Sequence, residues 1–165
     1  MQGLSPIAGQ GCKVLILGSF PGAESRRLRE YYAHRQNSFW RLMFSLFTEL
    51  YSSDYEVKKA LLLRHGVALW DVLYSHEGAG SADSAIKNPV PNDFSPFFRR
   101  YPGISHIFFN GAAAEKLFFA LIDRTYVPGG IPFTRLYSSS PANARFSFEE
   151  KLQNWSRIKD ALGKP

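Results

Sequence analysis

Cysteine is almost absent from the sequence. Cys12 is the one cysteine among 165 residues, so the chain can form no internal disulfide and cannot supply the four thiolates of an iron–sulfur or zinc site. The histidines are few and scattered, at positions 34, 65, 76 and 106, and neither HxxxH nor CxxC spacing occurs. These absences favour chemistry that is independent of metals, and we expect neither a metal nor another cofactor.

Long apolar runs are also absent. The sequence has neither the apolar core of a secretory signal nor a segment long enough to span a membrane. Apolar residues make up 45% of the chain and charged residues 21%, a balance typical of soluble globular proteins. We therefore expect a cytoplasmic protein without membrane association, with residues 1–165 forming a single domain around one sizeable core.

Acidic residues are in the minority. The chain has 14 acidic against 20 basic residues, a net charge of +6 and a pI of about 9.5. A basic balance favours partners that carry negative charge, such as nucleic acid or an anionic membrane surface. Charge alone does not choose between them, because many basic proteins bind neither.

Four short apolar runs predict buried strands, at residues 13–18, 66–73, 104–109 and 133–137. Helical patterns occur at residues 38–47, 54–65, 93–101, 112–123 and 148–162. This alternation predicts an α/β fold with three layers, α/β/α, around a central four-stranded, mainly parallel sheet. Residues 74–92 form a polar stretch, and a loop of that length in a compact domain is more often functional than idle.

Ligands bind beyond the carboxyl ends of the strands in sheets of this kind. The loops after Leu17, Leu73, Phe109 and Tyr137 should therefore gather at one edge, where we expect the active site. The first of these loops, GSFPG at residues 18–22, either lets backbone N–H groups approach a ligand closely or forms only a tight turn.

An aromatic-rich segment, YYAHRQNSFW at residues 31–40, leads into the first predicted helix. Proteins that extrude a base from nucleic acid hold it by aromatic stacking and by hydrogen bonds to its edges. Phe39 and Trp40 are better explained as core residues. Asn37 is either the cap of that helix or a functional amide.

Two further polar groups follow predicted strands. Asp71 is either a carboxylate that reads a ligand or a cap for the next turn. The segment SSSPANAR at residues 138–145 either brings hydroxyls, an amide and a cation to a phosphate or is a polar loop before a helix.

Six stretches, in order along nearly the whole chain, resemble the uracil-DNA glycosylase superfamily: LILGSFPG, YYAHRQNSFW, LWDVL, GSADSAIKNPVPND, FNGAAA and SSSPAN. The resemblance is closest to the hypoxanthine-DNA (deoxyinosine) glycosylase group. It implies a DNA repair enzyme that flips a deaminated base, with hypoxanthine favoured, and hydrolyses its N-glycosidic bond to leave an abasic site. The implied partner is DNA containing deaminated bases, bound by a monomer that needs no metal and no covalent lysine intermediate.

The resemblance also assigns roles to individual residues. Mismatch-specific uracil glycosylases carry GINPG in the first motif, where the Asn positions the attacking water, but Phe20 stands at that position here. Their segment resembling FAHPGNRFW matches residues 32–40, which puts the base-stacking aromatic at Tyr32 and, as in the hypoxanthine group, the catalytic amide at Asn37. The backbone amides of Ser19 and Phe20 are implied to bind the carbonyl oxygen of the base, and Asp71 to accept its ring N–H.

The second signature motif, HPSxxS or NPSxLS in relatives, begins here at Ser140. Neither His nor Asn stands there to stabilise the oxygen of a departing base, which disfavours strong excision of uracil. The resemblance implies that this loop contacts DNA through Ser138, Ser139, Ser140, Asn143 and Arg145. Arginines in or near these loops are candidates for phosphate contacts, namely Arg26, Arg27, Arg29, Arg35 and Arg145.

Three alternatives stay open on the sequence. The first is a mismatch-type glycosylase that acts mainly on uracil opposite guanine. The second is a catalytically silent nucleic-acid-binding module of the same fold. The third is an unrelated nucleotide-binding enzyme with the same sheet topology, because a fold alone does not settle function.

Overall fold

The computed structural model describes residues 1–79 and 82–163. At its centre lies a sheet of four parallel strands in the order β2-β1-β5-β6, formed by β1 (Val14–Gly18), β2 (Val67–Asp71), β5 (His106–Asn110) and β6 (Phe133–Leu136). Every residue of β1 and β2 is buried, as expected for parallel strands covered on both faces. The four predicted strands and the three-layer α/β/α architecture are confirmed.

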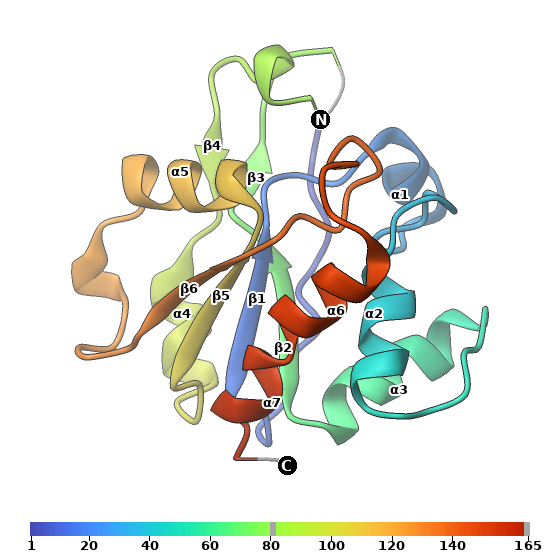
Figure 1. Cartoon of the computed structure of the whole chain (residues 1–165). Coiled ribbons are helices and arrows are strands. Elements are labelled where there is room, and N and C mark those ends of the chain that lie inside the picture. Colours follow the sequence, from blue (N-terminus) through green and yellow to red (C-terminus); the bar gives the residue numbers. More distant parts are fainter. Residues whose placement is uncertain (80–81, 164–165) are drawn as a thin grey trace.

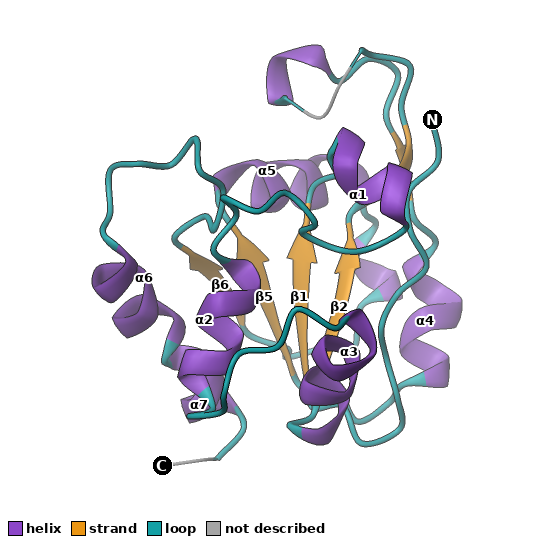
Figure 2. Cartoon of the chain, turned by 90° about the vertical axis from the view of Figure 1, so that its right-hand side faces the viewer, coloured by secondary structure: helices purple, strands orange, loops and turns teal. Residues whose placement is uncertain are grey.

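Helices cover both faces of this sheet (Figure 2). One face carries α2 (Phe39–Leu46), α3 (Tyr55–Arg64), α6 (Phe148–Trp155) and α7 (Arg157–Ala161), and the other carries α4 (Phe94–Arg100) and α5 (Ala112–Leu121). Asp54 and Asp93 begin α3 and α4 by accepting hydrogen bonds from first-turn amides. The largest fully buried side chains are aromatic and fill the spaces between the layers: Trp155, Phe39, Phe94, Phe108, Phe109 and Phe118.

Two predicted elements end differently from expectation. The last helix, predicted at 148–162, is interrupted at Ser156, which caps α6 and precedes α7. The Ser156 hydroxyl donates to the Gln153 carbonyl at 2.6 Å, and the Ser156 amide is shared between the Leu152 and Gln153 carbonyls. Such local bonding of a serine tightens and bends a helix.

The strand predicted at 66–73 stops at Asp71. Leu73 instead begins β3 (Leu73–Ser75), which pairs antiparallel with β4 (Val90–Pro91). This hairpin, which also carries the short helix η1 (Asp83–Ala85), projects beyond the carboxyl ends of the central strands (Figure 1). The predicted loop at 74–92 therefore contains a hairpin. Gly80 and Ser81, which begin the GSADSAIKNPVPND stretch, lie outside the described residues. Two short elements were not predicted at all, α1 (Ala23–Leu28) and η2 (Arg124–Tyr126).

The N-terminal segment runs along the outer side of β2. The backbones of Ile7 and Leu69 exchange two hydrogen bonds, at 2.9 and 2.8 Å, in an isolated antiparallel bridge. Closer to the N-terminus, the Gly3 amide donates to the Tyr74 carbonyl on β3 at 2.6 Å. Across the described part of the chain, no helix combines the length and apolar character needed to cross a membrane.

Candidate functional site at the carboxyl edge of the sheet

Three strands deliver small or polar residues to the same point of the sheet edge. Gly18 ends β1 and pairs with Asp71, which ends β2. On the other side of β1, Leu17 pairs with Phe109, so Asn110 at the end of β5 comes next to Gly18. The loops predicted to gather at this edge therefore do so, as the rule for parallel sheets requires.

Gly18 makes space for two polar groups. A Cβ on this residue would lie 2.5 Å from Asp71 Oδ1 and 2.8 Å from the Tyr32 hydroxyl oxygen. Both distances are too short for real contacts, so only a glycine lets the Asp71 carboxyl and the Tyr32 hydroxyl occupy their present positions. The requirement arises from close packing, because the φ of Gly18 is not in the left-handed region.

Asp71 is a buried carboxyl with spare hydrogen-bonding capacity. Its side chain is 3% exposed, and its Oδ2 atom has no hydrogen-bond partner among the described residues. Desolvation raises the pKa of Asp71 from 3.8 to about 7. The cap alternative for Asp71 is not observed, because no described residue donates a hydrogen bond to its side chain. Asn92 Nδ2 donates to the Asp71 backbone carbonyl at 2.8 Å. An unpartnered, buried carboxyl at the ligand edge of a sheet is suited to reading a polar ligand.

Tyr32 presents an aromatic ring to this edge. One face of its ring stacks on Phe39, with centroids 4.2 Å apart and planes inclined by 21°. Its φ of 52° is in the left-handed region, an uncommon and strained conformation for an aromatic residue. Burial and the neighbouring charge of Asp71 raise the pKa of Tyr32, so its hydroxyl stays protonated. The prediction that Phe39 and Trp40 are core residues agrees with their burial.

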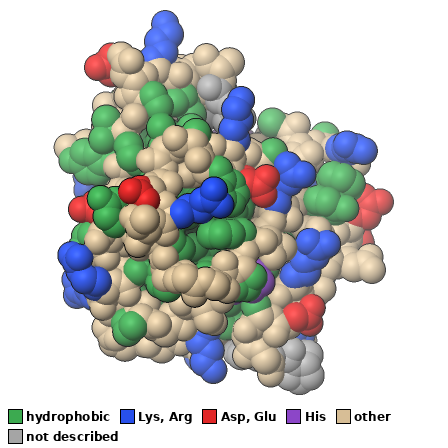
Figure 3. Space-filling model, turned by 90° about the vertical axis from the view of Figure 1, so that its left-hand side faces the viewer, with side chains coloured by type: hydrophobic (Ala, Val, Ile, Leu, Met, Phe, Trp, Pro, Cys, Tyr) green, Lys and Arg blue, Asp and Glu red, His purple; other side chains and the backbone are tan. Residues whose placement is uncertain are grey.

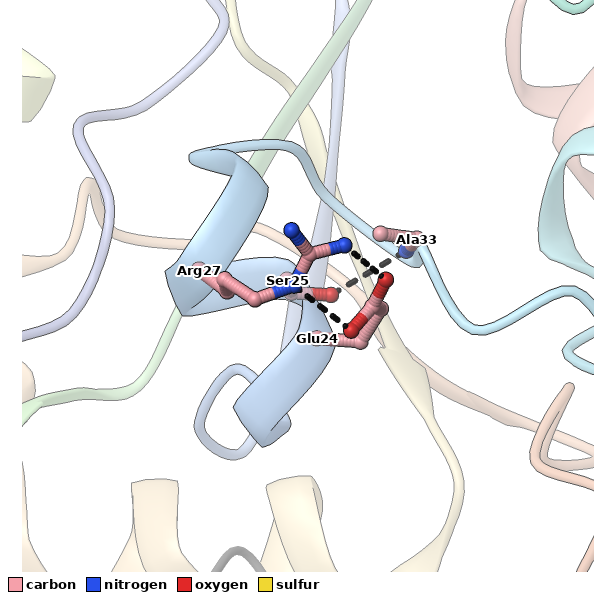
Figure 4. Close-up of polar contacts among 4 residues, drawn as sticks. All are labelled: Glu24, Ser25, Arg27 and Ala33. Atoms are coloured by element: carbon pink, nitrogen blue, oxygen red, sulfur yellow. Dashed lines mark hydrogen bonds and ion pairs between the residues drawn. The ribbon is translucent and has the colours of Figure 1, made fainter.

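Neighbouring elements fix the backbone around Tyr32. The Trp40 indole donates to the Tyr31 carbonyl at 2.7 Å, and the Tyr31 amide donates to the Tyr55 hydroxyl at 3.1 Å. On the other side of Tyr32, the Ala33 amide donates to Ser25 Oγ on α1 at 3.1 Å (Figure 4). These contacts hold a strained residue in place, as expected where the surrounding structure determines its conformation.

Asn37 immediately precedes Ser38, the N-cap residue of α2, whose own side chain makes no capping hydrogen bond. The Asn37 Oδ1 accepts a hydrogen bond from the Phe39 amide at 2.9 Å, so Asn37 satisfies the first amide of the helix, and the capping alternative is observed in this sense. Capping leaves hydrogen-bonding capacity, because an amide oxygen has a second lone pair and Asn37 Nδ2 donates to no other described residue. The side chain is only half-buried. Asn37 therefore remains available to hold a water molecule.

The start of α2 is joined to the loop after β6. The Ser38 amide and hydroxyl both donate to the Ser139 carbonyl, at 3.0 and 3.1 Å. Asn37, which precedes Ser38, is thereby brought next to the second signature segment, although the two are about a hundred residues apart in the chain. The segment resembling FAHPGNRFW and the second signature motif thus meet at one edge.

The loop after β1 keeps two backbone donors available. The Ser19 carbonyl accepts from the Leu73 amide at 3.1 Å, which fixes the loop beside the hairpin. Within residues 1–79 and 82–163, the amides of Ser19 and Phe20 donate to no protein acceptor. The Phe20 side chain points elsewhere, because it is buried edge-on against His76 with ring centroids 4.5 Å apart.

The loop at 138–145 is held by its own side chains. The Ser138 and Ser140 hydroxyls accept from the amides of Ser140 and Ala142, at 3.1 and 3.2 Å. Asn143 Nδ2 donates to the Ser138 carbonyl at 3.3 Å. Arg145 is exposed, with its guanidinium 5.3 Å from the centroid of the Phe146 ring. The exposed tip of this loop therefore consists of an ordered turn followed by a cation.

The candidate phosphate-binding arginines differ in their surroundings. Arg27 forms a two-pronged ion pair with Glu24 on α1 (Figure 4). Arg26 lies over the Phe20 ring, 5.8 Å from its centroid. Arg29 and Arg35 are exposed and form no ion pair with a described residue. The face that carries α4 and α5 mixes basic, acidic and apolar side chains and has no continuous basic stripe (Figure 3).

Sequence reasoning missed one residue of this edge. Asn110 connects Tyr32 and the 138–145 loop through three side-chain hydrogen bonds, each 2.9 Å long. The signal that identified Asp71 also applied to Asn110, since both are polar residues that end a buried apolar strand. No role was expected for Asn110 from the sequence.

Comparisons with known proteins agree with this arrangement. Residues 7–159 match the uracil DNA glycosylase superfamily. A protein of Methanosarcina barkeri named hypoxanthine DNA glycosylase is 34% identical over 159 residues, which cover 94% of this chain and 95% of the relative. A protein of the same name from Methanosarcina acetivorans is 34% identical over 158 residues, covering 95% and 96%. The solution NMR structure of a uracil DNA glycosylase candidate from Methanosarcina acetivorans has a TM-score of 0.80 and 34% identity, with 98% of each chain covered.

Proposed function

The chain belongs to the uracil DNA glycosylase superfamily, and we propose that its principal substrate is hypoxanthine in DNA. The protein is a DNA glycosylase, an enzyme that hydrolyses the N-glycosidic bond between a base and its deoxyribose. The substrate proposal is supported by the names of the two Methanosarcina relatives and by the pattern of donors and acceptors at the carboxyl edge.

The observation that carries the proposal is the buried Asp71 carboxyl beside the available amides of Ser19 and Phe20. A deaminated base presents a ring N–H next to a carbonyl oxygen, whereas adenine presents an acceptor nitrogen next to an amino group. A carboxylate accepts from the ring N–H, and backbone amides donate to the carbonyl oxygen. This pair complements hypoxanthine and leaves adenine with unmatched groups, which costs binding energy in a buried site.

We assign the remaining steps to residues at the same edge. Tyr32, supported from behind by Phe39, stacks on the flipped base. The Asn37 amide holds a water molecule at C1′ of the sugar. The C1′–N9 bond breaks, its electron pair leaves with the base, and the amides of Ser19 and Phe20 stabilise the developing charge on the base oxygen. The water oxygen bonds to C1′ and loses its proton to solvent.

Ser140 supports hypoxanthine over uracil. Relatives that excise uracil carry His or Asn at this position, where the side chain stabilises a base oxygen. In uracil a carbonyl is adjacent to the ring nitrogen that leaves, so charge collects on that oxygen. In hypoxanthine the leaving nitrogen, N9, has no adjacent carbonyl. A site without His or Asn at this position is therefore less impaired for hypoxanthine than for uracil.

The test is abasic-site formation on otherwise identical duplexes that carry hypoxanthine, uracil, xanthine or thymine. We expect release of hypoxanthine to be fastest and release of thymine to be undetectable. Faster release of uracil than of hypoxanthine would favour the mismatch-type alternative. Binding of these duplexes without any base release would indicate a silent binding module.

Substitution of Tyr32 tests the stacking role. We expect Tyr32→Ala to weaken binding to hypoxanthine DNA about tenfold or more, because base–aromatic stacking contributes about 1–3 kcal/mol per base. Binding to undamaged DNA depends on phosphate contacts and should change little. Fluorescence anisotropy on the two duplexes measures both affinities.

Tyr32→Leu is the matched control for this experiment. Leucine fills much of the space beside Phe39 but offers no aromatic face, so it separates stacking from cavity formation. We expect Tyr32→Leu to bind hypoxanthine DNA as poorly as Tyr32→Ala. Parallel losses of affinity for damaged and undamaged DNA in both variants would argue against stacking on a flipped base.

A further inference from the structure

Asn110 is a side chain whose hydrogen bonds all go to residues of the proposed site. Its Oδ1 accepts from the Ser139 amide, and its Nδ2 donates to the Ser139 hydroxyl and to the Tyr32 hydroxyl, each at 2.9 Å. The partners are 29 and 78 residues away in the chain. A side chain with only one such partner would be ordinary structural support, but this one joins two separate functional segments.

The orientation of the Asn110 amide follows from these partners. The Ser139 backbone N–H is a donor only, so the Asn110 atom that faces it is the oxygen. The nitrogen of Asn110 must then face the Tyr32 hydroxyl, which accepts this bond and keeps its own proton for another acceptor. Burial keeps that hydroxyl protonated, since it raises the pKa of Tyr32. Asn110 thus sets both the position and the polarity of the Tyr32 hydroxyl.

The same chain of contacts continues to the start of α2. Ser139 is 1% exposed, and its carbonyl accepts from the amide and the hydroxyl of Ser38. Tyr32, Asn110, Ser139 and Ser38 are therefore linked in series, and Asn37 is the residue before the last of them. The segments proposed to stack on the base, to contact DNA and to hold the water share one hydrogen-bonded support.

We propose that Asn110 is a positioning residue of the glycosylase, one that holds the Tyr32 ring and the 138–145 loop in a single arrangement. Contact of that loop with DNA and capture of the flipped base then occur in one geometry. This inference rests on the proposed function, since it assigns Tyr32 to the base and the loop to DNA. The proposal assigns Asn110 no contact with the substrate, because both of its Nδ2 protons and one lone pair of its Oδ1 are engaged by the protein.

A double-substitution cycle tests this proposal. We expect Asn110→Ala to lower the single-turnover rate of hypoxanthine release by about tenfold to a hundredfold, because small misplacements of a site have effects of this order. Affinity for undamaged DNA should stay within about twofold, since phosphate contacts dominate it. Tyr32→Phe removes the hydroxyl but keeps the ring, and it should slow release in the wild-type background and have little further effect in the Asn110→Ala background.

A spectroscopic signal separates positioning from general stability. With 2-aminopurine next to the lesion, wild-type protein should increase the fluorescence as the base is flipped, and Asn110→Ala should reduce this increase at saturating protein. Asn154→Ala is the matched control, because Asn154 Oδ1 accepts from the amide of Tyr137, the residue just before the loop, at 2.8 Å and makes no hydrogen bond with Tyr32 among the described residues. We expect Asn154→Ala to lower thermal stability and to retain the fluorescence change and the rate of release.

The outcomes distinguish this inference from the function on which it rests. Additive effects of Asn110→Ala and Tyr32→Phe, or equal losses in Asn110→Ala and Asn154→Ala, would overturn the positioning role while the glycosylase activity stands. If Asn110→Ala does not fold, Ser139→Ala removes one of its bonds, and the cycle with Tyr32→Phe is measured on that variant with the same criteria. A wild-type protein that releases no hypoxanthine would overturn the proposed substrate, and this inference with it.

Discussion

Replacing Asn37 by alanine is expected to slow base release by about two to three orders of magnitude, the usual effect of removing a group that positions or activates the nucleophile. The reason is that the first motif offers no amide, since Phe20 stands where relatives have Asn. Asn37 is then the amide best placed to hold the water, because it adjoins the loop of Ser139 through Ser38. Single-turnover kinetics on hypoxanthine DNA measure the effect.

Asn37→Ala removes both the proposed water-holding amide and a hydrogen bond to the start of α2, and Asn37→Ser separates these two effects. Loss of a helix cap lowers stability by about 1 kcal/mol, and alanine removes the bond from Asn37 Oδ1 to the Phe39 amide. Serine is an equally good capping residue, but its hydroxyl is too short to reach a water at the sugar. We expect Asn37→Ser to keep the wild-type melting temperature and to be as slow as Asn37→Ala. Wild-type rates in the serine variant would show that Asn37 is only a cap.

The second large effect concerns Asp71 and pH. Burial raises the pKa of Asp71 from 3.8 to about 7 in the folded protein, so the folded state favours the protonated carboxyl. The unfolded chain releases this proton near pH 4. The free energy of unfolding therefore falls as the pH rises from about 4 to about 7 and changes no further above that range, with a contribution of about 4 kcal/mol at roughly 1.4 kcal/mol per pKa unit.

Asp71→Asn should remove this dependence. Urea unfolding at pH 5 and at pH 8 measures the free energy of unfolding, and we expect the variant to be more stable than wild type at pH 8 and much closer to it at pH 5. Asp160→Asn, an exposed position on α7 at the opposite end of the sheet, is the control and should keep the wild-type slope. The same slope in wild type and in Asp71→Asn would show that Asp71 does not titrate in this range.

The same titration should appear in activity. If the ring N–H of hypoxanthine donates to the Asp71 carboxylate, base release rises as Asp71 ionises, through a midpoint near pH 7. Asp71→Asn should be slower at pH 8 and should lose that inflection. The carboxyl that reads the base then also destabilises the folded protein at alkaline pH, which is the trade-off expected of a buried functional group.

Much of the fold followed from local patterns. Runs such as VLILG and VALWD are apolar throughout, and only strands buried on both faces tolerate that pattern. The missed elements lack such patterns. The helix α1 has the six residues AESRRL, too few for a helical periodicity, and the β3–β4 hairpin pairs a three-residue strand with a two-residue strand that contains proline. The hairpin is joined to the N-terminal segment by the bond from the Gly3 amide to the Tyr74 carbonyl, and α1 is joined to the segment after it by the bond from the Ala33 amide to Ser25 Oγ.

The site residues also fall into those that local sequence identifies and those that depend on distant contacts. Asp71, Tyr32 and Asn37 were identified because they follow strands or match a family segment, and the structure brings all three to one edge of the sheet. The position of Asn110 at the end of a buried strand was visible in the sequence, but its role was not, since that role depends on partners far along the chain. The composition likewise gave no indication that Arg27 forms an ion pair with Glu24, which lies one helical turn before it on α1.

The bridge between Ile7 and Leu69 has a consequence for how this protein exists at high concentration. β2 is an outermost strand of the sheet, and bare outer strands invite pairing with another molecule. By occupying backbone groups in the middle of β2, residues of the N-terminal segment leave fewer donors and acceptors for pairing with the same edge of another molecule. We therefore expect this side of the sheet to be a poor site for edge-to-edge aggregation.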